Sequence, residues 1–208
     1  MGKIPHSKLE MLKHLYYEKK LSMRSIADLL GVSLDAVIYF MRHFELKRRT
    51  FSEISKIKFE NKKPSFKEKK INSIYEKELR AIGVMLYWGE GYKTNKSTCV
   101  DFANSDPEMI DMFVKYLNNT YELQKSKFRV LLYCYSDQNI KDLIDFWSKL
   151  TKIPKNQFTK PYVRKDFRQD GRKMKHGLVH IRYHDKKLLL NIKNYIDFYK
   201  NKFLGIKR

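Results

Sequence analysis

Residues 76–91 have the sequence EKELRAIGVMLYWGEG, which begins polar and then becomes apolar on every side. A helix of this composition is buried all round, so we expect it at the centre of a domain. Gly83 in its middle costs about 1 kcal/mol relative to alanine unless another helix backbone approaches there. The helix ends in Gly89, Glu90 and Gly91, which present the Glu90 carboxylate at the open helix end. Carboxylates that project near phosphates commonly hold a divalent metal ion, so Glu90 is a candidate metal ligand.

Strands and helices alternate after this segment. Hydrophobic patterns predict strands over residues 98–103, 127–135, 158–165 and 178–184, and helices over 109–121, 140–150 and 187–200. The fold class that follows is α+β, with helices packed on one face of an antiparallel sheet. Alternation along the strands places basic side chains on the opposite face, which suits a DNA groove; the candidates for DNA contact are Arg129, Lys160, Arg164 and Arg182.

Two polar features of these elements have simpler interpretations than catalysis. Ser105 or Asp106 can act as the N-cap of the helix that begins near Pro107, and we prefer this role to a catalytic one for Asp106. His180 and His184 share a strand face but lie about 13 Å apart, so a two-histidine metal site is not expected.

Residues 8–46 predict three short helices. Within them, residues 21–46 (LSMRSIADLLGVSLDAVIYFMRHFEL) have the spacing of a helix-turn-helix, with an ordinary helical hairpin as the alternative. Ser33 can cap the third helix, whose early and outward residues would enter the major groove. The candidates for DNA contact are Ser33, Leu34, Asp35, Tyr39 and Arg42, followed by a backbone or minor-groove arm of Lys47, Arg48 and Arg49.

Composition divides the chain into three parts. We expect a helix-turn-helix domain over residues 1–50, a basic linker over 51–73 with a possible short helix inside it, and an α+β domain over 74–208. The linker is polar and rich in lysine, and it contains Pro64 without a sustained hydrophobic period.

The charge of the chain points to a polyanionic partner. Its 208 residues include 44 Lys and Arg against 23 Asp and Glu, a formal net charge of +21. Such an excess causes self-repulsion and is usually retained for binding nucleic acid. Two basic blocks, residues 42–70 and 152–175, each carry aromatic side chains among the charges. No membrane span, signal peptide, disulfide framework or zinc motif is recognisable, so we expect an intracellular, nucleoid-associated location in the cytoplasm.

The segment GVMLYWGEG, residues 83–91, resembles the motif of the LAGLIDADG homing endonucleases and their regulatory relatives. The later segments NSDPEMIDMFVKYL and HIRYHDKKLLLNIKNYI also resemble that family. The resemblance implies a homodimer through the motif helix, with Ile82, Gly83, Leu86 and Tyr87 at the interface. It further implies that Glu90 of each copy binds Mg²⁺ as a catalytic acid near the scissile phosphate. The alternative for Glu90 is a salt bridge to Lys93 or Arg80.

These observations together predict a sequence-specific double-stranded DNA-binding protein. The more specific hypothesis is a homing-type, metal-dependent endonuclease that cleaves phosphodiester bonds. The alternative is a transcription regulator that binds without cleaving. An RNA-binding, maturase-like protein ranks third, because A-form RNA denies side chains its major groove.

Overall fold

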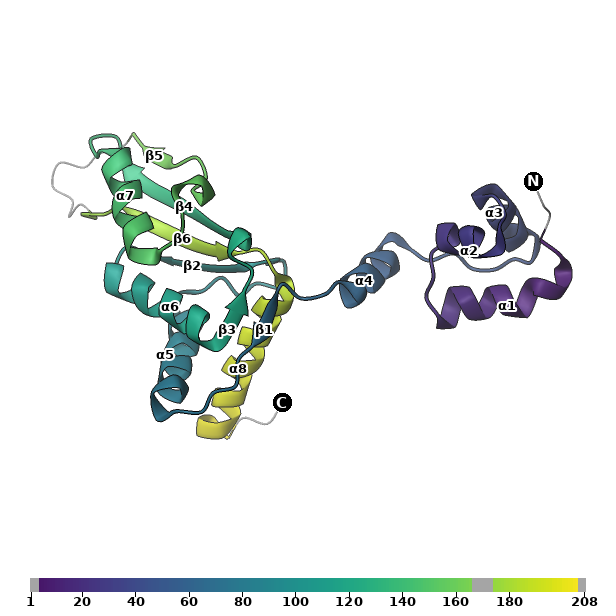
Figure 1. Cartoon of the computed structure of the whole chain (residues 1–208), viewed down its shortest axis with the longest axis horizontal. Helices are drawn as coiled ribbons and strands as arrows, with labels where there is room; N and C mark the ends of the chain where they lie inside the picture. Colours follow the sequence, from purple (N-terminus) through teal and green to yellow (C-terminus); the bar gives the residue numbers. More distant parts are fainter. Residues whose placement is uncertain (1–3, 166–173, 206–208) are drawn as a thin grey trace. The chain divides into compact units, whose positions relative to one another are not determined.

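The computed structural model describes residues 4–165 and 174–205. The chain forms two compact units, Met1–Lys63 and Pro64–Arg208, each with its own hydrophobic core (Figure 1). The second expected basic block lies only partly within the description, because residues 166–173 fall outside it. We describe the first unit and then the second.

The first unit consists of short helices. Their bounds are η1 His6–Lys8, α1 Leu9–Lys13, η2 His14–Glu18, α2 Met23–Leu30, α3 Leu34–His43 and α4 Phe51–Asn61. Ser22 and Ser33 cap α2 and α3, each side chain accepting a hydrogen bond from the backbone N–H three residues later. Gly31 takes a φ of 64° at the end of α2, a left-handed conformation that glycine adopts readily and that lets α3 begin at Leu34.

The core of this unit separates the two faces of α3. Val37, Phe40 and Met41 are buried with residues of α2 and of the preceding helices. The remaining side chains of α3 are half-buried or exposed, as the helical spacing predicts.

The expected linker over residues 51–73 contains the short helix that the sequence allowed, α4, but its last part belongs to the second unit. Thr50 and Glu53 form a capping box that starts α4, although no residue of α4 is buried. Ser65 then donates its backbone N–H to Asp185 at 2.7 Å, and Phe66 packs edge-on against Tyr121. Because these contacts attach the chain to the α+β core, the division falls between residues 63 and 64 rather than at 74.

The second unit has the order α5 Ile74–Glu90, β2 Val100–Asn104, α6 Pro107–Thr120, β3 Tyr121–Leu123, η3 Lys125–Lys127, β4 Phe128–Tyr135, α7 Ile140–Thr151, η4 Lys155–Gln157, β5 Tyr162–Arg164, β6 Leu178–Tyr183 and α8 Lys186–Leu204. It is preceded by β1 Phe66–Glu68, which pairs antiparallel with β3. The α+β class is confirmed, and Asp106 is the N-cap of α6, accepting hydrogen bonds from the backbone N–H groups of Glu108 and Met109.

The main sheet has the strand order β2-β6-β4-β5. The pairs β2·β6 and β6·β4 are antiparallel, whereas β5 runs parallel to β4. The prediction of a purely antiparallel sheet is therefore wrong at this edge. The reason is the helix α7, which crosses over between β4 and β5 and returns the chain in the same direction.

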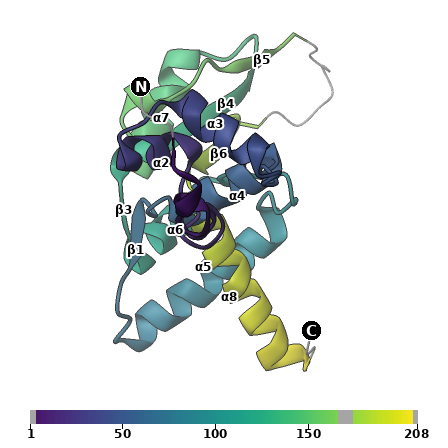
Figure 2. The ribbon, with the colours of Figure 1, turned by 90° about the vertical axis from the view of Figure 1, so that its right-hand side faces the viewer.

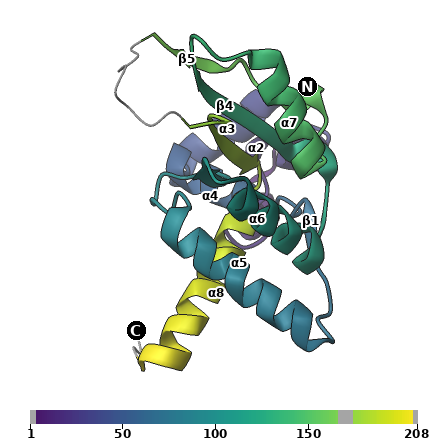
Figure 3. The same cartoon turned by 90° about the vertical axis from the view of Figure 1, so that its left-hand side faces the viewer.

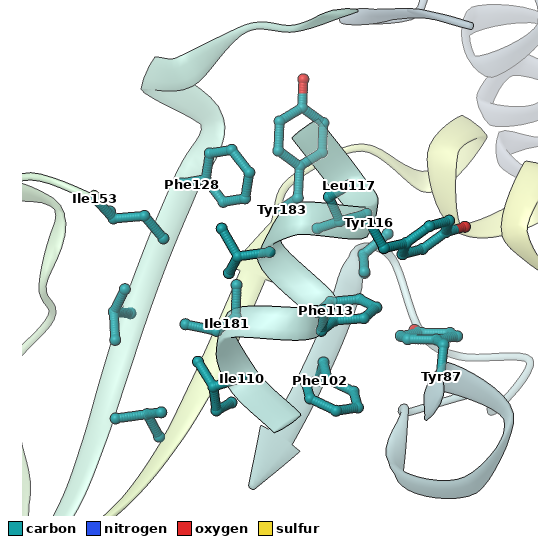
Figure 4. Packing of buried hydrophobic residues seen from close by; sticks show 14 of the residues in the cluster. Tyr87, Phe102, Ile110, Phe113, Tyr116, Leu117, Phe128, Ile153, Ile181 and Tyr183 are labelled. Carbon is teal, nitrogen blue, oxygen red and sulfur yellow. The ribbon is translucent and has the colours of Figure 1, made fainter. Parts of the chain in front are cut away.

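The helices cover one face of this sheet. Buried and half-buried residues alternate along β4 and β6, and the buried set packs against α5, α6, α7 and α8. Figure 4 shows Phe113 of α6 directed toward Phe102 of β2 and Tyr87 of α5; the ring centroids of Phe102 and Phe113 are 4.1 Å apart. The helices α5 and α8 cross each other beside this core (Figure 2, Figure 3).

The helix α5 is not buried on every side, which corrects the first expectation from its sequence. Leu79, Gly83, Val84 and Tyr87 face the core, while Ile82, Met85 and Trp88 remain 46%, 37% and 37% exposed. Among the described residues, the Lys200 ammonium on α8 lies 4.7 Å from the centre of the Trp88 ring, and Ile82 and Met85 stay partly exposed on this side of the helix.

Candidate nucleic-acid interface

The outward face of α3 is the first candidate surface. Tyr39 is 71% exposed and stacks on His43, and Asp35 and Arg42 are also exposed. Leu34 is half-buried beside them. Ser33 differs from the others, because its hydroxyl accepts the hydrogen bond from the Ala36 N–H and so holds the start of the helix. Its expected role in DNA contact is therefore secondary to its role as a cap.

The three basic residues after α3, Lys47, Arg48 and Arg49, differ in their contacts. Lys47 and Arg48 are exposed. Arg49 instead donates to the Leu21 carbonyl at 3.0 Å, and its guanidinium lies 4.0 Å above the ring of Tyr16. The prediction that Arg49 belongs to a free arm is corrected, since these contacts join it to η2 and to the segment between η2 and α2.

The second candidate surface is the sheet face opposite the helices, which we call the open face. A row near one end of the strands consists of Asp101, Arg182 and Arg129, which pair across β2, β6 and β4. Tyr133 pairs with Tyr162, and Tyr135 pairs with Arg164, on the side toward β5. The register thus brings Arg129, Arg164 and Arg182 onto one face, in agreement with the alternation in the sequence. Lys160 lies just before β5 and is exposed.

Asp101 is the residue of this face that sequence reasoning missed. Its carboxylate lies 2.8 Å from Nε of Arg182 and 2.8 Å from Nδ1 of His180. Burial alone would raise the pKa of Asp101, but the hydrogen bonds and charges of His180 and Arg182 outweigh burial and hold the pKa below its usual value. The signal was present as an aspartate on the outward side of a strand, yet its partners are about 80 residues later in the chain.

Aromatic rings continue this cluster along the open face. The ring of Tyr133 lies 5.2 Å from that of His180 and 5.0 Å from that of Tyr162. Tyr162 is 56% exposed and is flanked in sequence by Lys160 and Arg164. Rings beside cations are a favourable combination for contact with nucleic-acid bases and phosphates.

Glu90 is exposed at the end of α5. Among the described residues it forms neither of the two ion pairs considered from the sequence. Arg80 pairs with Glu68 at 3.7 Å, and Lys93 donates to the Gly91 carbonyl at 2.6 Å. Burial lowers the pKa of Lys93, and the negative charge of Glu90 opposes that shift, so the two groups are near one another.

The residues around Glu90 do not by themselves fit a magnesium ion. Within the described ranges, no group of three or more His, Cys, Asp or Glu side chains could hold a metal. Mg²⁺ prefers several oxygen ligands in octahedral geometry, and one exposed carboxylate supplies too few of them.

The expected dimer interface is also revised. A Cβ at Gly83 would lie 2.0 Å from Cγ of Tyr116, and Tyr87 is fully buried with its hydroxyl donating to the Tyr92 carbonyl. Both residues therefore pack inside their own chain and are not available to a second copy. Ile82 is exposed and Leu86 half-buried, so these two remain candidates.

Comparison of the chain with protein families, with curated proteins and with solved structures finds no match. Over the residues that the structure describes, no helix has the length and apolar character to cross a membrane.

Proposed function

We propose that the protein binds double-stranded DNA in a sequence-specific manner, with α3 as the recognition helix of a helix-turn-helix. The observation that carries this proposal is the pair of capped helices α2 and α3, joined through left-handed Gly31, with the outward side of α3 exposed. This arrangement offers base-contacting side chains on a helix that is itself held by a core. The net charge of +21 supports a polyanionic partner.

Two side chains of α3 would contact different bases. Arg42 is exposed near its end and can donate two hydrogen bonds to guanine, while Leu34 near its start can contact a thymine methyl group. Lys47 and Arg48 follow and would contact the phosphate backbone. The open face of the second unit would add a further basic contact surface through Arg129, Arg164 and Arg182.

Selection of bound sequences from a random duplex pool tests this proposal. We expect an enriched motif for the wild-type protein. Arg42→Ala is expected to change that motif and to weaken binding to the best site by about 1–3 kcal/mol. Lys47→Ala should weaken all duplexes alike. Lys77→Ala is the control, because it removes one exposed positive charge from α5, outside both candidate surfaces. Equal effects of all three substitutions would contradict the assignment of α3.

A DNA endonuclease is the second candidate, and the exposed side of α5 favours it. Ile82, Met85 and Trp88 form a partly exposed apolar stripe on the helix that ends at Glu90, with the Lys200 ammonium 4.7 Å from the centre of the Trp88 ring. A second copy bound to this stripe would place two α5 helices side by side, each ending at Glu90. A divalent ion shared by the copies requires at least these two carboxylates. Glu90 itself projects about 140° from the centre of the stripe. The non-cleaving regulator is the same protein without this chemistry.

Two measurements separate these candidates. Light scattering should report a dimer, and Ile82→Glu should convert it to a monomer. Incubation of the selected duplex with Mg²⁺ should give strand breaks with the wild type and none with Glu90→Gln, which retains the shape of the side chain. Binding without breaks by the wild type would leave the regulator, and identical cutting by Glu90→Gln would remove Glu90 from the reaction. Competition with RNA tests the third-ranked function.

A further inference from the structure

Two arginines lie directly opposite each other on the open face, near the start of β4 and the end of β6. Arg129 on β4 pairs in register with Arg182 on β6. Like charges in this cross-strand position repel and destabilise a sheet. Within the described chain only Arg182 is neutralised, by its ion pair with Asp101. Arg129 instead donates hydrogen bonds to the backbone carbonyls of Ser126 and Phe128.

The contact between Asp101 and Arg182 leaves a specific part of the guanidinium available. The carboxylate accepts from Nε at 2.8 Å, and its other oxygen lies 2.8 Å from Nδ1 of His180. In the part of the chain that the structure describes, Nη1 and Nη2 of Arg182 have no hydrogen-bond partner, and the side chain is 30% exposed. Asp101 thus holds the Arg182 guanidinium at Nε, and the Nη1 and Nη2 groups remain available as two donors.

The surroundings restrict the rotation of this unit. The Asp101 side chain is only 13% exposed, and His180 is equally covered, with the ring of Tyr133 beside it. With the ionised carboxylate as acceptor, Nδ1 of His180 is the donor of this hydrogen bond. A side chain fixed before binding loses less conformational entropy when it forms its contacts.

We propose that Asp101 is a positioning residue that holds Arg182 as a guanine reader on the open face, its two Nη groups donating to O6 and N7 in the major groove. This inference rests on the proposed function and names a base that the second unit recognises. A fork of two parallel donors matches the two acceptors of guanine, and lysine cannot reproduce it. A phosphate would accept the same donors, but such a contact would carry no base preference.

The charge of Asp101 makes the proposal sharply testable. A carboxylate on a DNA-binding surface repels every duplex, so Asp101→Asn should leave binding to unrelated duplexes unchanged or make it tighter. The wild-type protein should prefer guanine at one position by a factor on the order of 10 to 100. In Asp101→Asn this preference should fall toward none. A purely structural role for Asp101 would instead weaken all binding together. Asp111→Asn is the matched control, because it breaks a partly exposed ion pair with Lys115 on α6.

The experiment uses the full chain and the selected duplex. Each guanine is replaced in turn by 7-deazaguanine, which lacks the N7 acceptor but still pairs with cytosine. We expect one position at which this replacement weakens the wild type and Asp111→Asn about 10-fold or more, while Asp101→Asn and Arg182→Lys are insensitive.

Three results would overturn the inference. In the first, Asp101→Asn keeps the guanine preference of the wild type. In the second, Arg182→Lys weakens all duplexes alike, which identifies a phosphate contact. In the third, the wild-type protein selects no duplex at all, which removes the proposed function together with the inference; the first two results leave duplex binding itself intact.

Discussion

Replacement of Gly83 by alanine is expected to destabilise the second unit, because the added Cβ has no space. It would lie 2.0 Å from Cγ and 2.4 Å from Cβ of Tyr116 on α6. These atoms are close to the α6 backbone, and the Tyr116 ring is fully buried, so a change of rotamer cannot relieve the overlap. The helices α5 and α6 must therefore separate.

The magnitude follows from two opposing effects. Alanine is favoured over glycine within a helix by about 1 kcal/mol. Overpacking of a filled core costs about 1–3 kcal/mol, and an overlap this deep belongs at the upper end. We expect the free energy of unfolding to fall by about 2 kcal/mol.

Tryptophan fluorescence during chemical denaturation measures this effect directly. The two tryptophans of the chain, Trp88 and Trp147, both belong to the second unit, so the signal reports that unit alone. Gly89→Ala on the same helix is the control. Its Cβ would meet nothing within 4 Å, so we expect a gain of about 0.5–1 kcal/mol. If Gly83→Ala unfolded at the same denaturant concentration as Gly89→Ala, the argument for close packing of α5 on α6 would be refuted.

Three further predictions address caps, acid stability and salt. Ser33→Ala removes the cap of α3 and should lower the stability of the first unit by about 1 kcal/mol in thermal unfolding followed by circular dichroism, whereas Ser33→Asp should retain it. Burial raises the pKa of Asp185, but hydrogen bonds from Ser65 and from the backbone of Lys187 and Leu188 outweigh it and keep the pKa below its usual value. The stability that this carboxylate contributes is therefore present above the unfolded pKa and lost as the pH falls through the folded one; Asp185→Asn should flatten the pH dependence of unfolding below about pH 4. Duplex affinity measured against salt concentration should fall steeply, and Arg48→Ala should reduce the slope by about one unit if it contacts a phosphate.

Local features of this fold could be predicted from the sequence because their signals are close together in the chain. The caps Ser33 and Asp106 each act on an N–H within three residues, and the structure confirms both. Periodicity likewise separated the buried and exposed sides of α3 and the two faces of β4. Such patterns require no knowledge of distant partners.

The predictions were wrong where a residue's contacts are with residues far away in the sequence. The parallel pairing of β5 depends on where the chain lands after α7, and the role of Gly83 depends on Tyr116 in another helix. Ser65 seemed part of a linker because its acceptor, Asp185, lies 120 residues later. Within the candidate site, the role of Asp101 could not be predicted because its partner Arg182 is also far away in the sequence. The arginines of the open face were predictable from strand alternation alone.

The short strand β5 also has a consequence for the behaviour of the protein at high concentration. It forms one edge of the main sheet among the described strands, and all three of its residues are exposed. An uncovered edge offers backbone groups to any neighbouring chain and can start edge-to-edge aggregation. Here the edge is only three residues long and ends in Arg164 followed by Lys165, so electrostatic repulsion disfavours the approach of a second edge. The same cations that suit this region to an anionic ligand therefore also protect it from self-association into fibrils.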